Sequence, residues 1–478
     1  MVSRPRRITG VPRSSASVPF ALAMALLLTA CTSGAHGRPG ASGVGDPYFP
    51  KAGNGGYDAR HYALTLSYEP KTRHLTGEAV ISARATQDLG AFDLDLKGLR
   101  VESVTVDGHT ADHHRTGQEL TVRPHDDLPE GSDFRVVVRY AGTPETITDE
   151  DDAKEGWLPT ADGALALGEP VGSMAWFPGS HHPSDKATYD IAVTVPKGLR
   201  AVSNGELRGT TTDGNGKRTT YRWHTAEPMA SYLATVAIGD FDIGRSRTKS
   251  GLPVYTAVDP GQAGASAEVL SRLPDIVEWE TRRFGPYPFS STGAIVAEAE
   301  NVGYALETQN RPVFPGAPDT GTLVHELAHQ WYGDSVTPES WRDMWLNEGF
   351  ATYAEWLWEE DHGGDTADAV FDALYAADPA ADPEAKARWA FPPAKPSGAA
   401  HISDSPVYER GAMVLHKVRE TVGDDTFFAL LKGWAAAHRH GNADTADFTA
   451  YVERQAPDKD LAPVWRDWLY GEGKPAER

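Results

Sequence analysis

The pattern of hydrophobic and polar positions divides the chain into two regions. Between about residues 60 and 240, short segments alternate hydrophobic with polar positions or carry β-branched runs, and clusters of turn-forming residues separate them. This pattern predicts strands at 61–68, 77–85, 92–96, 134–140, 188–195, 219–223 and 231–241. We therefore expect an all-β domain, with bounds at 48–248.

After about residue 250 the hydrophobic positions recur at helical spacing. Short strands at 254–258 and 293–297 suggest a small sheet, and a loop rich in Pro, Ser, Gly and Ala at 391–406 leads towards Tyr408. Helices are predicted at 265–284, 320–332, 346–360, 366–377, 408–422 and 425–438. A second, mainly helical domain is therefore predicted at 249–478.

The N-terminal residues have the order of a secretory signal. Basic residues precede an apolar run at 19–28 that is too short to span a bilayer, and the sequence Leu-Thr-Ala-Cys ending at Cys31 resembles a bacterial lipobox. A lipoprotein signal peptide is predicted at 1–30, a lipidated Cys31 after it, and a flexible tether at 31–47. We expect an exported protein that its lipid anchors on the outer face of the bacterial cytoplasmic membrane.

Composition narrows the classes of function. The formal net charge of -22 argues against a nucleic-acid binder, because a basic surface is needed to neutralise phosphates. The chain has one cysteine, which excludes an internal disulfide. No run after the signal reaches the roughly 18 apolar residues of a membrane span, so membrane contact is expected through the lipid alone. A monomer is expected.

A metal site is predicted from two segments. The sequence HELAH at 325–329 fits the pattern H-E-x-x-H, and on a helix positions i and i+4 share a face, so His325 and His329 can bind one ion. Glu326 can approach a metal-bound water without binding the metal, as a general base does. Glu348, on a second amphipathic helix, completes a His₂Glu site with an open fourth position. We therefore predict one catalytic Zn²⁺ per chain.

The sequence around these ligands resembles the M1 (aminopeptidase N-like) metallopeptidases. Their pattern is H-E-x-x-H, eighteen residues and then Glu, and eighteen residues separate His329 from Glu348. The resemblance implies a multidomain fold, in which an N-terminal all-β saddle-like domain precedes a thermolysin-like, mainly α-helical (α+β) zinc catalytic domain.

A second motif extends the resemblance. The segment GYALE resembles the family's G-x-M-E-N exopeptidase motif, with leucine in place of methionine and threonine in place of asparagine. The resemblance implies an edge strand that pairs with the substrate backbone and a glutamate, Glu307, that binds the free α-amino group. The implied substrate-binding residues are Gly303, Tyr304, Ala305, Leu306 and Glu307.

Two further positions are carried over from the family. The sequence GEP around Glu169 resembles the N-terminal stretch that adds a second acidic or amide side chain to the amine site. Two carboxylates around one ammonium would fix the position of the first peptide bond. The sequence YERG resembles the family's Y-E-K-G, whose tyrosine, here Tyr408, donates a hydrogen bond to the oxyanion.

Together these motifs imply a zinc metallo-aminopeptidase that hydrolyses the N-terminal bond of peptides with a free amine. Two alternatives stay open: a catalytically silent M1-like binding module, and a relative of the epoxide hydrolases. Ser403 stands where the latter carry a second tyrosine. The pairs at 113–114 and 181–182 are histidines beside turn-forming residues, and we expect both pairs to be solvated loops.

Overall fold

We describe a computed structural model of the chain, in which residues 37–149, 151–299, 302–476 and 478 are described. The predicted signal peptide at 1–30, the lipidation residue Cys31 and the first residues of the predicted tether lie outside these ranges.

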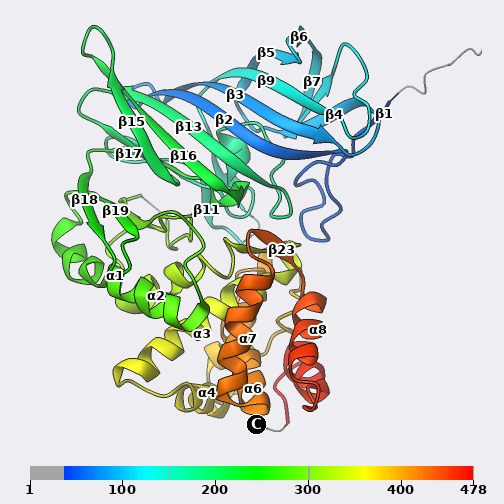
Figure 1. Ribbon diagram of the computed structural model, residues 1–478, viewed down its shortest axis with the longest axis vertical. Coiled ribbons are helices and arrows are strands. Elements are labelled where there is room, and N and C mark those ends of the chain that lie inside the picture. The colour runs from blue at the N-terminus through cyan, green and yellow to red at the C-terminus, as the bar shows by residue number, and fades with distance from the viewer. Residues whose placement is uncertain (1–36, 150, 300–301, 477) are drawn as a thin grey trace, which may run out of the picture. The chain divides into compact units, whose positions relative to one another are not determined.

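An eight-stranded sheet forms most of the β region (Figure 1). Along its strand β2, Leu64 and Leu66 are buried whereas Thr65 between them is exposed, so the alternation in the sequence corresponds to one buried face. In spatial order the strands are β15 (Glu206–Thr212), β16 (Arg218–Ala230), β13 (Lys186–Pro196), β2 (Tyr57–Glu69), β3 (His74–Ala85), β9 (Asp133–Gly142), β5 (Arg100–Val106) and β6 (His109–Thr110).

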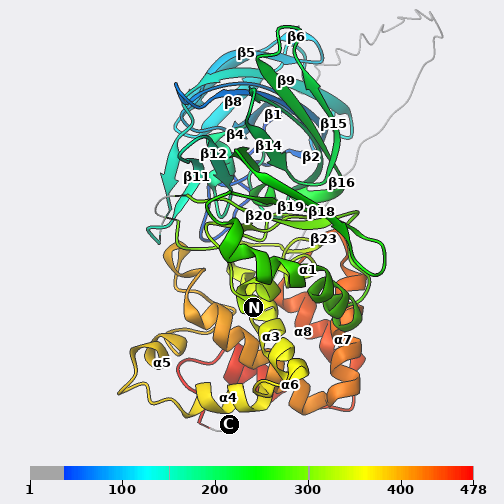
Figure 2. The same ribbon diagram turned by 90° about the vertical axis from the view of Figure 1, so that its left-hand side faces the viewer.

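Two smaller sheets share a hydrophobic core with this sheet, to which Leu64, Leu94 and Leu165 all contribute. Figure 2 shows the strands of the β region curving around that core. One sheet has the order β10 (Thr146–Thr148), β11 (Lys154–Pro159), β12 (Ala164–Leu167), β17 (Val236–Gly239), β14 (Arg200–Ser203), and the other the order β1 (Arg38–Pro39), β4 (Leu89–Asp95), β8 (Glu119–Arg123), β7 (Asp112–Thr116).

A third small sheet introduces the helical region. Its order is β18 (Asp242–Arg247), β19 (Pro253–Val258), β20 (Thr292–Val296), β21 (Val313–Phe314). β19 and β20 are parallel, and helix α1 (Ala263–Phe284) is the crossover that parallel strands require. Because β18 pairs with β19, this sheet begins shortly before the predicted domain boundary at 249.

Helices dominate the remainder of the chain (Figures 1 and 2). A further parallel pair joins β22 (Val336–Pro338) to β23 (Gly441–Ala443). The helices are α2 (Thr320–Ala328), α3 (Trp345–His362), α4 (Ala367–Ala376), α5 (Pro383–Arg388), α6 (Gly411–Val422), α7 (Asp424–Ala437) and α8 (Thr445–Gln455). α8 is absent from the predicted helices, although the capping box of Asp444 and Asp447 marks its start.

Asp46, at the end of the predicted tether, is a buried anchor. Its carboxylate accepts hydrogen bonds from Ser340 Oγ at 2.8 Å and from the Trp341 amide at 3.0 Å, and lies 3.2 Å from His182 Nε2. Arg38 also donates its amide to the Asp88 carbonyl at 2.8 Å. The described part of the segment expected to be a tether is therefore bound to the folded body.

The expectation that His181 and His182 are solvated is wrong. Both are buried, at 2% and 3% exposure, and Nε2 of His181 lies 3.0 Å from the Phe177 carbonyl oxygen. The segment containing Asp46 covers His182, and this contact between distant parts of the chain leaves no local signal in the sequence. The other pair, His113 and His114, is exposed, but it lies on β7.

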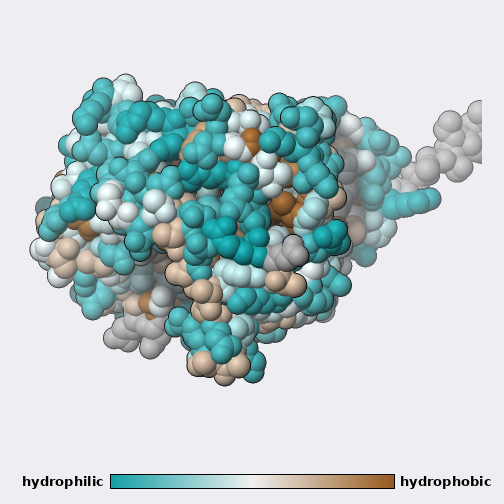
Figure 3. Space-filling view, turned by 90° about the horizontal axis from the view of Figure 1, so that it is seen from below, coloured by the Kyte–Doolittle hydropathy of each residue, from teal (hydrophilic) through white to brown (hydrophobic). Residues whose placement is uncertain are grey.

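The face seen in Figure 3 is mainly hydrophilic, with isolated hydrophobic residues. Among the described residues, the large hydrophobic side chains that are exposed are Val44 and Tyr470. Within the described ranges, no helix combines the length and the hydrophobicity needed to cross a bilayer.

Candidate metal centre and active site

Helices α2 and α3 bring the three predicted metal ligands together. α2 begins after Asp319, whose side chain accepts a hydrogen bond from the Thr322 amide at 2.7 Å and so caps the helix. From its C-terminal end, Nε2 of His325 and Nε2 of His329 lie 3.1 and 3.3 Å from Oε2 of Glu348 on α3. Two imidazoles and one carboxylate thus converge on one point.

This geometry fits zinc. A tetrahedral zinc ion with bonds of about 2.0–2.1 Å holds its ligand atoms about 3.3 Å apart. The measured separations from Oε2 of Glu348 agree with that value. Each imidazole is also oriented through its other nitrogen, since Nδ1 of His325 lies 2.7 Å from Glu355 Oε1 and Nδ1 of His329 lies 3.1 Å from the Tyr332 carbonyl oxygen.

The sequence interpretation did not include Glu355. It follows Glu348 by seven residues on α3, so both carboxylates project from the same side of the helix, where they reach His325. The two-turn spacing is a signal from which this residue could have been found.

Glu326 has the environment of a general base. It is 6% exposed, and its Oε2 atom has no hydrogen-bond partner among the described residues. Burial raises the pKa of Glu326 to about 8, although His325 and His329 oppose this shift. Glu326 lines the same cavity as the three metal ligands. A water molecule and a substrate would lie in this cavity.

That cavity has a volume of about 240 Å³. Several of the predicted substrate-binding residues line it, whereas Gly303 and Leu306 do not. Leu306 is buried and pairs with Val313 in an isolated bridge, so the described part of 303–307 is not the continuous edge strand that the resemblance implied. The lining residues include Glu169, Tyr304, Ala305, Glu307, Tyr408, Ser403, Asp149 and Asp151.

Two further carboxylates, those of Glu169 and Glu307, lie beside the metal ligand Glu348 in this cavity. Carboxylate oxygens of Glu169, Glu307 and Glu348 lie within 4.8 Å of one another. Glu307 is 2% exposed, and its Oε1 atom accepts a hydrogen bond from Asn347 Nδ2 at 3.0 Å. Burial, together with the nearby Glu307, raises the pKa of Glu169. Acids in this arrangement are stabilised by a bound cation, such as a substrate ammonium.

Tyr408 reaches the metal ligands from a π-helical turn, Pro406–Arg410, that precedes α6. Its ring stacks on His325, with centroids 6.0 Å apart and an angle of 16° between the ring planes. Gly349 on α3 and Gly411 on α6 permit this approach, because a Cβ atom at Gly349 would lie 2.9 Å from the Gly411 carbonyl carbon. Arg410 points elsewhere, and its guanidinium donates to backbone carbonyls such as that of Trp468.

Comparisons with known proteins agree with this site. The chain matches the family description "Peptidase M1 N-terminal domain" over residues 58–233 and "Peptidase family M1 domain" over residues 315–468. The chain belongs to peptidase family M1. The predicted fold class, an N-terminal all-β domain followed by a mainly helical catalytic domain, is therefore confirmed.

Named relatives of this M1 chain include two aminopeptidases. Aminopeptidase 2 of Candida albicans is 25% identical over 456 residues, which are 87% of this chain and 47% of that protein. Endoplasmic reticulum aminopeptidase 1 of Homo sapiens is 25% identical over 428 residues, 81% of this chain and 44% of that protein. The chain thus spans less than half the length of each of these two relatives.

Solved structures match this M1 chain over a larger share of their own length than the two aminopeptidases do. The M1 zinc metallopeptidase from Deinococcus radiodurans superposes with a TM-score of 0.82 at 29% identity, covering 91% of this chain and 98% of that one. A mutant of that protein bound to a Tyr-Ser-Ala substrate has the same TM-score and identity, and is covered over 100% of its length.

Proposed function

We propose that this M1 chain is a zinc-dependent aminopeptidase, which hydrolyses the N-terminal bond of peptides that carry a free amine. One observation supports this most strongly. A complete His₂Glu ligand set and a pair of carboxylates suited to an ammonium open on the same cavity of about 240 Å³. The first peptide bond of a substrate held by its amine would therefore lie beside the metal.

His325, His329 and Glu348 would hold the zinc ion, whose positive charge polarises the substrate carbonyl and acidifies water. Glu326 accepts the proton of the attacking water and passes it to the leaving nitrogen. Tyr408 donates a hydrogen bond to the oxygen that becomes negatively charged.

The remaining residues of the site orient the reactants. Glu169 and Glu307 bind the N-terminal ammonium, and Asn347 fixes the Glu307 carboxylate through the 3.0 Å hydrogen bond. Glu355 keeps the His325 ring in the orientation that points Nε2 at the metal position.

Both alternatives are disfavoured by particular residues. A silent binding module has no need for a buried base with a free oxygen, yet Glu326 has one. An epoxide hydrolase of this family would be expected to place a second tyrosine where Ser403 lines the cavity.

The substitution Glu326→Gln tests the proposed mechanism. It preserves the side-chain shape, so zinc content measured by atomic emission should stay near one per chain while kcat on an aminoacyl coumarin amide falls by about 10²–10⁴-fold. Glu359→Gln, an exposed residue on α3, is the matched control and should leave kcat unchanged. An unchanged kcat in the Glu326 variant with full zinc would remove this residue from the reaction.

We also propose that the chain is exported and anchored by a lipid on Cys31. The basic, apolar and Leu-Thr-Ala-Cys segments of the N-terminus support this. In a bacterial host, the full chain should take up labelled palmitate and sediment with membranes, and Cys31→Ser should abolish the label. A labelled Cys31→Ser variant would refute lipidation at this residue.

A further inference from the structure

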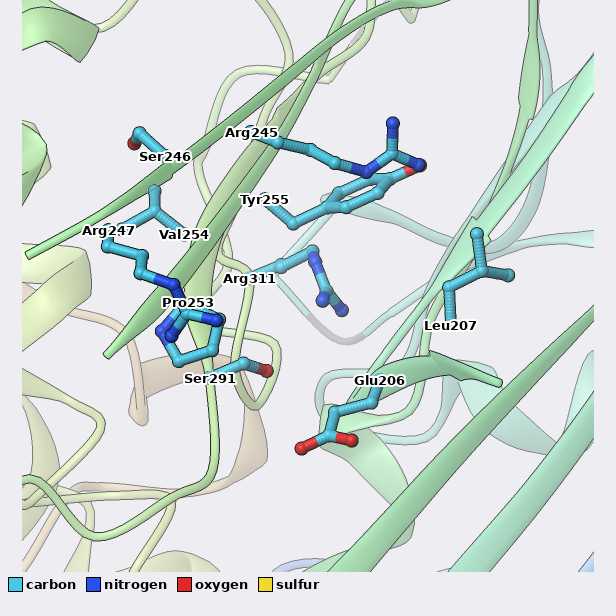
Figure 4. Close-up of a pocket in the computed structure, with 10 residues that line it drawn as sticks. All are labelled: Glu206, Leu207, Arg245, Ser246, Arg247, Pro253, Val254, Tyr255, Ser291 and Arg311. Carbon is cyan, nitrogen blue, oxygen red and sulfur yellow. The ribbon is translucent and has the colours of Figure 1, made fainter. Parts of the chain in front are cut away.

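A second cavity, of about 620 Å³, lies between β15 and the β18–β19 hairpin (Figure 4). None of its lining residues lines the cavity that holds the zinc ligands. Three of its ten lining residues are arginines, namely Arg245, Arg247 and Arg311. Such a concentration of positive charge is unexpected in a chain of formal net charge -22.

Acidic residues do not neutralise these arginines. Among the described residues, Glu206 is the one acid that lines the cavity, and its carboxylate lies 2.8 Å from Arg208 Nη1. Within the described ranges, no carboxylate lies within 4.0 Å of a guanidinium nitrogen of Arg245, Arg247 or Arg311. The cavity therefore keeps a positive charge.

Arg311 contributes the buried part of that charge. It is 1% exposed, and its guanidinium lies 4.8 Å from the ring centre of Trp223 and 4.9 Å from that of Tyr255. Nη1 donates to the Ser203 carbonyl at 2.6 Å, whereas Nε has no partner among the described residues. Burial lowers the pKa of Arg311 to about 10, so the group remains charged at neutral pH. Ring faces and carbonyls offset part of the cost of burying this charge, and a bound anion would offset more.

The two exposed arginines, Arg245 and Arg247, line the same cavity. Arg245 and Arg247 are two residues apart on β18, so their side chains leave the same face of the strand. The guanidinium of Arg245 lies 5.1 Å from the ring centre of Tyr255, and Figure 4 shows Arg245 and Arg311 on opposite sides of that ring. Tyr255 thus orders both guanidinium groups at the cavity.

We propose that this cavity binds a phosphate-type oxyanion, with Arg245 and Arg247 as its accessible ligands and Arg311 as a fixed positive charge behind them. Guanidinium groups match the geometry of phosphate oxygens and form charge-assisted hydrogen bonds with them. The volume of about 620 Å³ exceeds the needs of phosphate alone, so the group could be free phosphate or part of a phosphomonoester.

Calorimetric titration of the folded chain with sodium phosphate and with phenyl phosphate, at constant ionic strength, tests the proposal. We expect saturable binding of one anion per chain, and at least about tenfold weaker binding in the double variant Arg245→Gln, Arg247→Gln, because each substitution removes a charge-assisted hydrogen bond. Tighter binding of phenyl phosphate would identify a phosphomonoester as the preferred form, and equal binding would identify the phosphate group alone.

The matched control removes the same charge elsewhere. The variant Arg100→Gln, Arg139→Gln replaces two exposed arginines of β5 and β9 and should bind both anions as the unmodified chain does. Absence of saturable binding in the unmodified chain, or an equal loss in both double variants, would overturn the proposal. Circular dichroism of each variant verifies that the comparison is made between folded proteins.

Discussion

Replacement of Glu307 by glutamine would separate cleavage of free N-termini from cleavage of blocked peptides. The carboxylate is buried, accepts a hydrogen bond from Asn347 at 3.0 Å and lies near Glu169 in the proposed amine site. Glutamine has the same shape and retains an oxygen for Asn347. The substitution therefore removes the negative charge opposite the substrate ammonium with little change in packing.

The expected loss can be estimated from the hydrogen bond that disappears. A hydrogen bond to a charged group contributes about 1.5–3 kcal/mol, which corresponds to a decrease of about 10- to 150-fold in kcat/KM. Because Glu307 is only 2% exposed, solvent screens it weakly and the upper half of this range is expected. Glu169 is more exposed, so Glu169→Gln should cause a smaller loss.

The assay compares each aminoacyl coumarin amide with its N-acetylated form, and zinc content is measured in parallel. Glu307→Gln should lower kcat/KM for the free amines and leave the low rate on acetylated substrates unchanged. Two results would refute the reasoning. One is an unchanged kcat/KM on free amines, and the other is an equal loss on free and acetylated substrates with full zinc occupancy.

Three other predictions follow from particular contacts. Glu355→Gln should weaken zinc binding by about 10- to 100-fold in a chelator competition assay, because His325 loses a charged partner, whereas Glu359→Gln should not. Tyr408→Phe should lower kcat by about 10²–10³-fold with little change in KM, and a kcat near that of the unmodified enzyme would exclude the phenol from the reaction. Burial lowers the pKa of His181 to about 4, below its ordinary 6.5. The unfolded chain therefore takes up this proton at a higher pH than the folded chain does, and the folded state is favoured fully only above pH 6.5. The free energy of unfolding should fall by up to about 3 kcal/mol as the pH falls from 6.5 to 4. His181→Gln should reduce this pH dependence, which urea unfolding measures.

The parts of the fold that follow from local sequence were predictable. The alternation of hydrophobic and polar positions along 61–68 and 134–140 predicted strands that correspond to β2 and β9. Hydrophobic positions at helical spacing likewise predicted α1 and α3. The metal ligands could also be predicted from the sequence, because two positions of one helix and the spacing to Glu348 define them. The stacking of Tyr408 on His325 was not predictable in this way, since it depends on a π-helical turn and on the contact of Gly349 with Gly411.

The features that the sequence did not reveal depend on contacts between distant residues. Asp46 meets Trp341 across 295 positions, and this contact fixes a segment whose composition suggested a tether. Asn347 contacts Glu307 across 40 positions, although it stands beside a metal ligand that was predicted. In both cases a polar side chain gains its role from a partner that local patterns do not identify.

The charge of the active site connects its metal and its substrate. Six acidic residues line the cavity and, among the described residues, no Lys or Arg does; four of the acids are Glu169, Glu307, Glu326 and Glu348, and the other two are Asp149 and Asp151. Burial raises the pKa of both Glu169 and Glu326. A zinc ion and one substrate ammonium together supply three positive charges, so each would favour the ionised form of the carboxylates around it. In the proposed aminopeptidase, an ammonium group held by Glu169 and Glu307 would therefore also favour the ionised form of Glu326, and peptides with blocked amines would lack this contribution.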